Sequence, residues 1–302
     1  MAESKAKTAV TIRDLESFDD LRQAEALEKE VWQLSDLDTT PLTLAVATRE
    51  AGAIWVGAFD GARLVGFAFG FLALEHGHLG VHSHMLAVHS AYRNLDLGYK
   101  LKLAQRERVL ALRAGDVRIT EMTWTFDPLQ SRNAHLNFAK LGVVSETYKI
   151  DFYGPETSSV LHRNSTDRLW VKWPLASRRV QDRLHGKDPR AEMLDALKTL
   201  TPLVQFNGDG KPVRADLEAA LRRQRIAVEI PSDILFVEKK DPALAREWRL
   251  HTRWAFTEAL KAGFLVVEFC RMVRGQQGPG AYLLEKIRPE EYVPELSRQR
   301  QG

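Results

Sequence analysis

The sequence contains little cysteine, little net charge and no long apolar run. Its 302 residues include one cysteine, Cys270, so an internal disulfide and a cysteine-based zinc site are excluded and a reducing compartment is expected. The formal net charge is only +3, with acids and bases mixed along the chain, which gives little support for a nucleic-acid-binding surface. No segment approaches the ~20 apolar residues needed to cross a bilayer, and residues 1–14 lack the apolar core of a signal peptide. We therefore expect a cytoplasmic protein with no nucleic-acid or membrane partner.

The length and composition favour a folded protein of two domains. Hydrophobic residues make up 44% of the chain and charged residues 27%, as in ordinary soluble proteins, and a domain usually takes roughly 100–200 residues. Residues 1–175 alternate between strand-like and helix-like runs, which favours a mixed α/β domain. Residues 176–190 are highly charged with few apolar anchors and predict a linker, and residues 191–302 predict a C-terminal α/β domain.

The first domain shows a regular order of predicted elements. Ser17 is expected to cap an early helix, and Asp60-Gly61 joins two apolar strands in a predicted hairpin. A strand over 79–88 leads into a helix from about Asp96 to Arg113. The buried stripe of that helix is expected to hold Leu97, Leu101, Ala104 and Ala111. The later elements are a strand over 118–126, a helix over 131–142 stopped by Gly142, and strands over 143–154 and 168–173.

The C-terminal domain is dominated by one predicted amphipathic helix. Asp241-Pro242 predicts its start and Gly263 its end. Strands are predicted over 226–230 and 264–273, and residues 278–287 can return as a hairpin partner. One face of the helix is expected to carry Leu244, Trp248, His251, Ala255 and Ala259. This apolar face must be buried somewhere. The C-terminal domain is expected either to cover the acceptor pocket or to form a homodimer.

The stretch HSHMLAVHSAYRNLDLGYKL, residues 82–101, carries the chemistry. His82 and His84 are two apart on a strand and project from one face. Imidazole has a suitable pKa to take a proton from an amine, so the pair is a candidate general base, with His84 the stronger candidate. The alternatives are a structural pair or a metal site completed by His76 or His78, with Glu75 close by.

A tight loop and a helix start follow the strand. Backbone N–H groups and the positive end of the helix dipole converge there, which suits a pyrophosphate, and Arg93 adds a positive charge. Asp96 is a candidate helix cap and is tolerant of a positive φ.

This stretch resembles the GNAT superfamily of acyl-CoA-dependent N-acyltransferases. The family's apolar strand end appears as Leu86-Ala87-Val88, followed by Arg93 and Gly98, whereas Asp96 replaces the first family glycine. The resemblance implies a GNAT fold, with a central mixed, mostly antiparallel and splayed sheet flanked by helices. It also implies acyl-CoA as co-substrate, without a metal, bound in this region by Leu86, Ala87, Val88, Arg93, Asn94, Leu95, Asp96, Leu97, Gly98 and Tyr99.

A second family element follows the next strand. Asn133 is similar to the asparagine near the start of the family's next helix, and FAKLG, residues 138–142, is similar to its "Tyr-x-Lys/Arg-x-Gly" ending. The resemblance implies that Asn133 and Phe138 contact CoA. In many relatives the tyrosine at the position of Phe138 protonates the departing thiolate, a role that a phenylalanine side chain does not have.

Two closer resemblances suggest the acceptor. HSHMLAVH is similar to the strand of arylalkylamine N-acetyltransferases whose two histidines are implicated in deprotonating the amine. WTFDPLQSRNAHLNFAKLG and FYG are similar to a bacterial subfamily of predicted GNAT acyltransferases, some of them linked to N-acylamino-acid racemases and thought to acylate amino acids with acetyl or succinyl groups.

Several residues are candidates for the acceptor side. Ser131 is expected to donate at a helix start or to cap it, and Arg132 is a candidate for gripping a carboxylate. Tyr153 is a further substrate-binding candidate, and Tyr148, Arg163 and Arg168 are weaker ones. The sequence therefore predicts transfer of an acetyl or succinyl group from CoA to a primary amine of an amino acid or related small molecule. The open alternatives are a catalytically inactive acyl-CoA sensor, which Asp96 and Phe138 favour, and a histidine-rich metalloenzyme.

Overall fold

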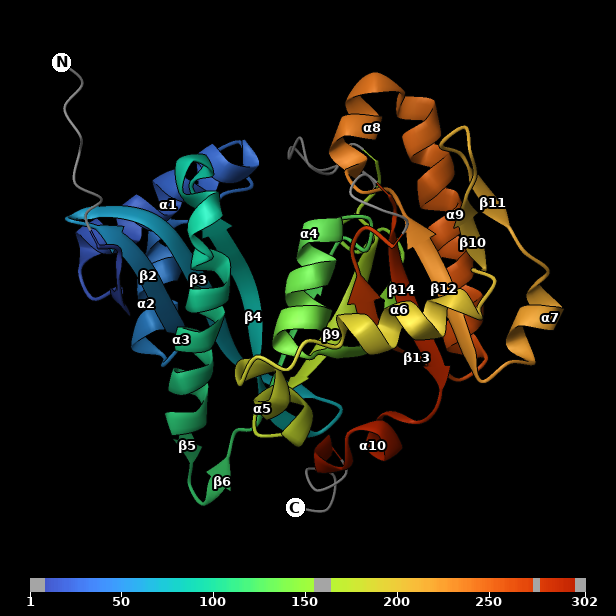
Figure 1. Ribbon diagram of the computed structural model, residues 1–302. Helices are drawn as coiled ribbons and strands as arrows, with labels where there is room; N and C mark the ends of the chain where they lie inside the picture. The colour runs from blue at the N-terminus through green and yellow to red at the C-terminus, as the bar shows by residue number, and fades with distance from the viewer. Residues whose placement is uncertain (1–8, 155–163, 274–277, 297–302) are drawn as a thin grey trace. The chain divides into compact units, whose positions relative to one another are not determined.

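The computed structural model describes residues 9–154, 164–273 and 278–296 (Figure 1). The described chain forms two compact units. Unit 1 holds residues up to 122, and unit 2 holds the described residues from 123 onward. In both units helices flank strands that pair mainly antiparallel, so the predicted α/β class is confirmed.

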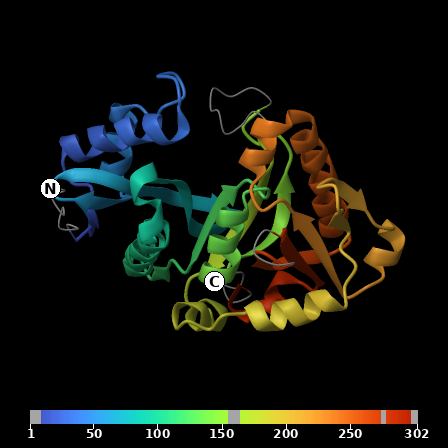
Figure 2. The ribbon, with the colours of Figure 1, turned by 45° about the horizontal axis from the view of Figure 1, so that its top comes forward.

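Unit 1 is a four-stranded antiparallel sheet between helices. The strand order is β1-β2-β3-β4, and a small hairpin, β5–β6, lies outside it. Helices α1 and α2 lie on one face and α3 on the other, as the blue and teal helices of Figure 2 show. The bounds are β1 Thr11–Asp14, α1 Phe18–Trp32, α2 Leu42–Glu50, β2 Ile54–Asp60, β3 Arg63–Glu75, β4 His78–Val88, η1 Ser90–Leu95, α3 Leu97–Ala111, β5 Arg113–Ala114 and β6 Val117–Arg118.

Local sequence signals explain much of unit 1. Ser17 caps α1 as predicted, and Asp20 completes a capping box by accepting from the Ser17 backbone N–H. The predicted β2–β3 hairpin is confirmed, and because Asp60 pairs with Arg63, its turn residues are Gly61, at φ 61°, and Ala62. On α3 the expected stripe is buried except for Ala111, which is exposed because the helix ends there.

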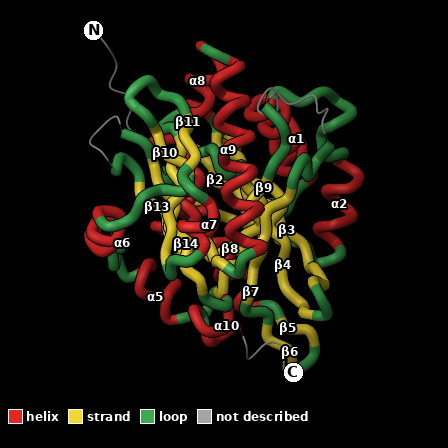
Figure 3. The backbone as a smooth tube through the Cα atoms, turned by 90° about the vertical axis from the view of Figure 1, so that its right-hand side faces the viewer, coloured by secondary structure: helices red, strands yellow, loops and turns green. Residues whose placement is uncertain are grey.

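Unit 2 is built on a longer mixed sheet. Its strand order is β7-β9-β8-β13-β14-β12-β10-β11, in which β10 and β12 are parallel. Helices α6 and α9 cover opposite faces (Figures 1 and 3). The bounds are β7 Glu121–Phe126, α4 Ser131–Ala134, a π-helix His135–Leu141, β8 Val144–Lys149, β9 Arg168–Pro174, α5 Arg178–Leu184, α6 Arg190–Lys198, β10 Val204–Phe206, β11 Pro212–Arg214, α7 Leu217–Leu221, β12 Arg225–Ile230, α8 Ile234–Lys240, α9 Pro242–Lys261, β13 Phe264–Cys270, β14 Gly280–Lys286, α10 Pro289–Tyr292 and a final 3₁₀ turn Pro294–Leu296.

The predicted long helix of the C-terminal region is confirmed as α9. Asp241 caps it by accepting from Leu244 N–H at 3.0 Å, and Gly263 follows its end at φ 85°. The predicted face needs correction: Trp248, Ala255 and Ala259 are buried, but Leu244 and His251 are only half-buried. The other buried residues of the helix are Ala245, Arg249, Thr252 and Phe256.

The β8–β13 pairing joins residues from the two predicted domains. Ser145 pairs with Val266, so residues 144–174 and 204–286 contribute strands to one sheet. The segment 176–190 contains α5, from which Arg179 and Arg183 both donate to the buried Glu268 carboxylate. The division at residues 175 and 190 stays a prediction.

Candidate functional site

The two strand histidines lie on β4 in unit 1. His82 is buried and His84 is exposed, and their ring centroids are 6.4 Å apart. Phe71 on β3 contacts both rings, at 5.7 Å from His82 and 6.2 Å from His84. Phe69 meets the His84 ring edge-on at 6.1 Å. The rings therefore share one side of the sheet and a common aromatic neighbour.

An irregularity in the strand pairing determines where His84 lies. Gly70 pairs with Ser83 and Phe69 pairs with Met85, so His84 is skipped in the β3–β4 register. Such a bulge adds one residue to a strand and redirects its side chains locally. In a regular strand, the two-residue spacing would place His82 and His84 on one face. In β4 the bulge lies between them, so the relative orientation of their rings also depends on the bulge.

The electrostatics of the pair favour a neutral His84. Although His84 keeps an exposed surface, partial desolvation by the surrounding protein lowers its pKa from the ordinary value of 6.5, and repulsion by a charge on His82 adds to this. Glu75 Oε1 lies 3.8 Å from His82 Nδ1, so a carboxylate is available beside His82. A neutral imidazole at pH 7 can accept a proton, which is what a general base requires.

The remaining family-like residues of β4 form the end of the strand. Ala87 is fully buried and pairs with Phe67, whereas Leu86 and Val88 are half-buried. Their roles in binding acyl-CoA stay predictions.

The loop after β4 ends in a left-handed residue. Residues 90–95 form a 3₁₀ turn, and Asp96 then takes φ 54° and ψ 26° before α3 begins at Leu97. Arg93, Asn94, Leu95 and Asp96 are exposed, Leu97 is buried, and Gly98 and Tyr99 are half-buried. Asp96 occupies the N-cap position of α3 as predicted, but its side chain makes no capping hydrogen bond to the helix. Its predicted tolerance of a positive φ is confirmed and preserves the sharp turn into the helix.

In unit 2 the predicted CoA and acceptor residues occupy different environments. Arg132 and Asn133 are exposed on α4. Phe138 is fully buried on the π-helix, with the Tyr282 ring edge-on at 5.7 Å. Ser131 is not the N-cap of α4, because Gln130 occupies that position. Ser131 is instead the first residue of the helix and is buried.

Tyr153, a predicted substrate-binding residue, has several described contacts. Its hydroxyl lies 3.4 Å from Thr125 Oγ1 on β7, and the Arg168 guanidinium lies 5.1 Å from its ring centre. The residue is 40% exposed. The roles of Arg132, Asn133, Phe138 and Tyr153 stay predictions, and Arg163 lies outside the described residues.

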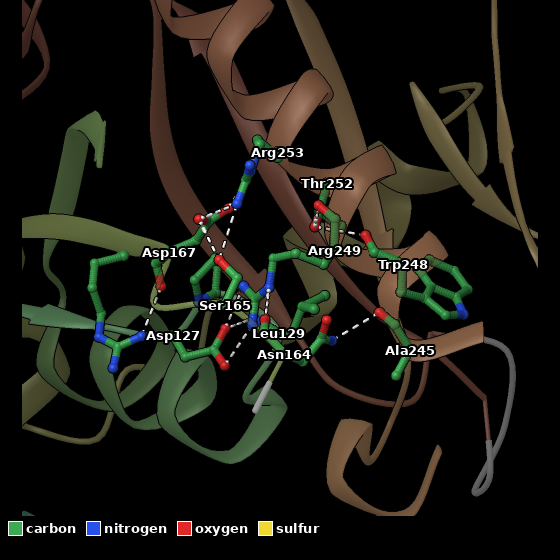
Figure 4. A network of polar contacts seen from close by, with 12 residues as sticks. Asp127, Leu129, Asn164, Ser165, Asp167, Ala245, Trp248, Arg249, Thr252 and Arg253 are labelled. Atoms are coloured by element: carbon green, nitrogen blue, oxygen red, sulfur yellow. Dashed lines mark hydrogen bonds and ion pairs between the residues drawn. The ribbon is translucent and has the colours of Figure 1, made fainter. Parts of the chain in front are cut away.

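A buried ion-pair network in unit 2 was not expected from the sequence (Figure 4). Arg249 on α9 holds Asp127 through two parallel bonds of 2.8 Å. One turn later Arg253 donates to the Asp167 carboxylate at 2.7 and 2.8 Å. Tyr148, a weaker acceptor candidate, donates its hydroxyl to the same carboxylate at 2.7 Å. Burial alone would lower the pKa of Arg249, but Asp127 outweighs it and the pKa is raised.

A second polar cluster was also missed, and it lies in unit 1. Ser83 on β4 meets Lys102 and Gln105 from α3, and all three side chains are buried. A signal was present: in α3, Lys102 and Gln105 fall at helical spacing beside the apolar residues Leu101 and Ala104. A lysine next to the apolar stripe of α3 is expected either to be buried with it or to mark the edge of the buried face.

Within residues 9–154, 164–273 and 278–296, no group of three or more His, Cys, Asp or Glu side chains is arranged to hold a metal ion. In the same residues no helix has both the length and the apolar character of a membrane span.

Comparison with known proteins gives structural similarity without a close sequence relative. No protein-family model and no curated protein matches the chain. The chain is similar to the ribosomal-protein-S18-alanine N-acetyltransferase from Escherichia coli, at 16% identity and a TM-score of 0.41, over 55% of this chain and 94% of that chain.

Two further solved structures are similar to the same extent. An acetyltransferase of the GNAT family from Streptococcus pneumoniae has 16% identity and a TM-score of 0.41, over 54% of this chain and 98% of that chain. The aminoglycoside 6'-N-acetyltransferase from Enterococcus faecium has 16% identity and a TM-score of 0.40, over 56% of this chain and 98% of that chain.

Proposed function

We propose that this protein is an acyl-CoA-dependent N-acyltransferase of the GNAT type that moves an acetyl or succinyl group to a primary amine. The observation that carries the proposal is that a histidine pair on β4 is followed along the chain by a sharp turn into helix α3. Two imidazoles lie beside a bulge of β4, and a left-handed turn at Asp96 opens helix α3 eight residues after the strand ends. The first supports proton removal from an amine, and the second supports binding of a pyrophosphate.

The proposed helix start offers donors of the right kind. The first N–H groups of a helix lack intrahelical acceptors and carry the positive end of its dipole. In α3 these belong to Leu97, Gly98 and Tyr99, with exposed Arg93 one turn earlier. The carboxylate of Asp96 stands at the same place and opposes a phosphate, so we expect weaker CoA binding than a glycine there would allow.

The proposed reaction is a direct transfer without a covalent enzyme intermediate. His84 takes a proton from the ammonium group of the acceptor, and the free amine attacks the thioester carbonyl. A C–N bond forms, the C–S bond breaks, the nitrogen releases its second proton to solvent, and the sulfur departs as thiolate, which solvent protonates. Phe138 cannot supply that proton, but a thiol with a pKa near 8.5 is a tolerable leaving group at neutral pH.

The acceptor and the acyl group are part of the proposal. We propose an amino acid or related small molecule as acceptor, with Arg132 and Tyr153 as the candidate binding residues. Both are exposed in unit 2, and Tyr153 is held by its backbone, whose N–H donates to Thr166 Oγ1 at 3.1 Å. A homodimer and a cytoplasmic location remain predictions.

The decisive experiment follows thiol release with acetyl-CoA or succinyl-CoA against a panel of amines. His84→Ala should lower kcat at pH 7 about 100-fold, the lower range for removal of a general base. The deficit should shrink toward pH 9, because free amine then becomes available without a base. The wild-type rate should rise with pH through a pKa below 6.5, because that of His84 is lowered.

His76→Asn is the matched control. His76 lies in the exposed β3–β4 turn at φ 51°, a conformation that asparagine tolerates. Its pH–rate profile should match the wild type. A His84→Ala profile that also matches the wild type would remove the base assignment.

One observation favours an acyl-CoA sensor as the second candidate function. The position of the family's tyrosine is occupied by Phe138, which is fully buried and has no ionisable group. Calorimetric binding of acetyl-CoA or succinyl-CoA, without thiol release for any amine, would support the sensor and exclude the transferase.

A further inference from the structure

A buried polar cluster lies on the α3 side of the unit 1 sheet, next to the strand histidines. It consists of Ser83 on β4 and of Lys102 and Gln105 on α3, which are 3%, 2% and 0% exposed. Lys102 Nζ donates to Ser83 Oγ at 2.6 Å and to Gln105 Oε1 at 3.5 Å. Ser83 Oγ donates in turn to Gln105 Oε1 at 2.8 Å. The three side chains form one connected group.

The cluster lies at the bulge of β4. Ser83 is the last residue paired with β3 before the skipped His84. Its partner must be glycine, because a Cβ on Gly70 would lie 2.9 Å from Gln105 Nε2 and 3.1 Å from the His82 carbonyl oxygen. The backbone of β3, the bulge and the Gln105 amide are therefore in close contact.

The cluster costs stability. Burial lowers the pKa of Lys102 to about 7, which means that its charged form is unfavourable in this site. The Gln105 Nε2 atom is buried without a hydrogen-bond partner. Apolar side chains of the same length would fill the space without either cost, so the polar groups point to a conformational role.

The hydrogen bonds supply that role. Successive side chains of a strand point to opposite faces, so a hydroxyl held toward α3 at Ser83 fixes the direction of its neighbours. His82 precedes Ser83 and His84 follows it at the bulge. Movement of Ser83 away from Lys102 would rotate both imidazoles away from Phe71.

We propose that Lys102 is a positioning residue that acts through Ser83 to fix the bulge of β4 and thereby the relative orientation of His82 and His84. The inference deepens the proposed function, on which it rests for the role of His84 as base. It assigns no contact with substrate to Lys102, which is buried. Its direct consequence is the geometry of the histidine pair, which can be measured without any turnover.

The test compares Lys102→Met with Lys29→Met in the full-length protein. Lys29 lies on α1 in a surface ion pair with Glu25, so the control makes the same substitution in the same unit. Histidine-labelled protein is observed by NMR, and ring resonances are assigned with single histidine variants. In Lys102→Met the ring signals of His82 and His84 should shift and those of the remaining histidines should not. The Lys29→Met spectrum should match the wild type.

The kinetic arm separates positioning from binding. Lys102→Met should lower kcat at least tenfold and leave the KM for acyl-CoA within about twofold, because α3 still forms the proposed phosphate site. Ser83→Ala should reproduce both results, and Ser83→Thr, which keeps a hydroxyl, should retain the wild-type spectrum and most of kcat. This pair also decides the matter if Lys102→Met does not fold.

Two outcomes would overturn the proposal. One is a set of His82 and His84 signals that is the same in Lys102→Met as in Lys29→Met. The other is equal behaviour of Ser83→Ala and Ser83→Thr. Absence of acyl transfer in the wild type would instead refute the proposed function, and the NMR comparison would still decide whether Lys102 orients the histidines.

Discussion

In unit 1 the buried Lys102 is held by a hydroxyl and an amide, whereas in unit 2 the buried Arg249 is held by a carboxylate through two parallel bonds (Figure 4). The effects on the pKa are opposite: it is lowered to about 7 for Lys102 and raised for Arg249. For a buried cation beside uncharged groups, desolvation is the main effect and lowers the pKa. A carboxylate at contact distance stabilises the charged form and raises the pKa. Unit 2 thus fixes its charges, while unit 1 contains a group able to change protonation near neutral pH.

The two arrangements also connect different kinds of segment. In unit 2, Arg249 and Arg253 on α9 hold carboxylates at the end of β7 and just before β9, which are far away in sequence. In unit 1, Lys102 donates to Ser83 on β4, at the position between the two histidines. The first arrangement joins α9 to the ends of β7 and β9, and the second joins α3 to β4 beside the bulge.

The strongest test of the comparison is Arg249→Met. It leaves the Asp127 carboxylate largely buried without its main partner, so unfolding of unit 2 should become easier by about 3–5 kcal/mol. Denaturant unfolding measures the change. Arg246→Met, an exposed arginine on the same helix, is the control and should change stability by less than about 0.5 kcal/mol. A loss below about 1 kcal/mol for Arg249→Met would contradict the view that this pair fixes α9.

A second test uses the pH dependence of stability. The folded pKa of Lys102 is below its unfolded value of 10.5, so between pH 7 and 10.5 the unfolded state binds more protons and stability rises with pH. From pH 7 to 9 the wild type should gain about 2 kcal/mol relative to Lys102→Met, at about 1.4 kcal/mol per pKa unit. Below pH 7 the difference should level off, because Lys102 is then protonated in both states.

The control for this second test is Lys29→Met. The Asp36 and Glu25 carboxylates raise the pKa of Lys29, so its protonation does not change between pH 7 and 9. The stability difference between this variant and the wild type should therefore be flat over that range. A flat difference for Lys102→Met as well would show that Lys102 keeps an ordinary pKa.

Local sequence signals predicted the elements of both units better than their polar interiors. The Asp60-Gly61 hairpin and the cap at Asp241 follow from residues close in sequence, and both were confirmed. The buried face of α9 was predicted from apolar residues alone, and this rule cannot place Arg249 in the interior. Its carboxylate partner lies 122 residues away, a distance over which periodicity gives no information.

In the candidate site, too, the sequence predicted the residues but not their detailed arrangement. The spacing of His82 and His84 predicted a shared face, and the shared aromatic neighbour is consistent with it. The bulge at His84 depends on the register of β3 against β4, and on Gly70, Ser83 and Gln105 meeting in space. A strand sequence that alternates normally contains no sign of such a slip, because the extra residue is defined only by its partner strand.

The sharpest test converts the unit 1 arrangement into that of unit 2. Gln105→Glu places a carboxylate where the amide oxygen now accepts from both Lys102 and Ser83, and it removes the buried Nε2 that lacks a partner. The new ion pair should raise the pKa of Lys102 toward or above its ordinary value, so the rise in stability between pH 7 and 9 should fall from about 2 kcal/mol to less than about 0.5 kcal/mol. At pH 7 the net stability should change by less than about 1 kcal/mol, because desolvation of the added carboxylate offsets much of the attraction. Unfolding of wild type and variant in parallel across this pH range measures both quantities, and a pH dependence that persists in Gln105→Glu would mean that the uncharged partners of Lys102 are not what distinguishes the two units.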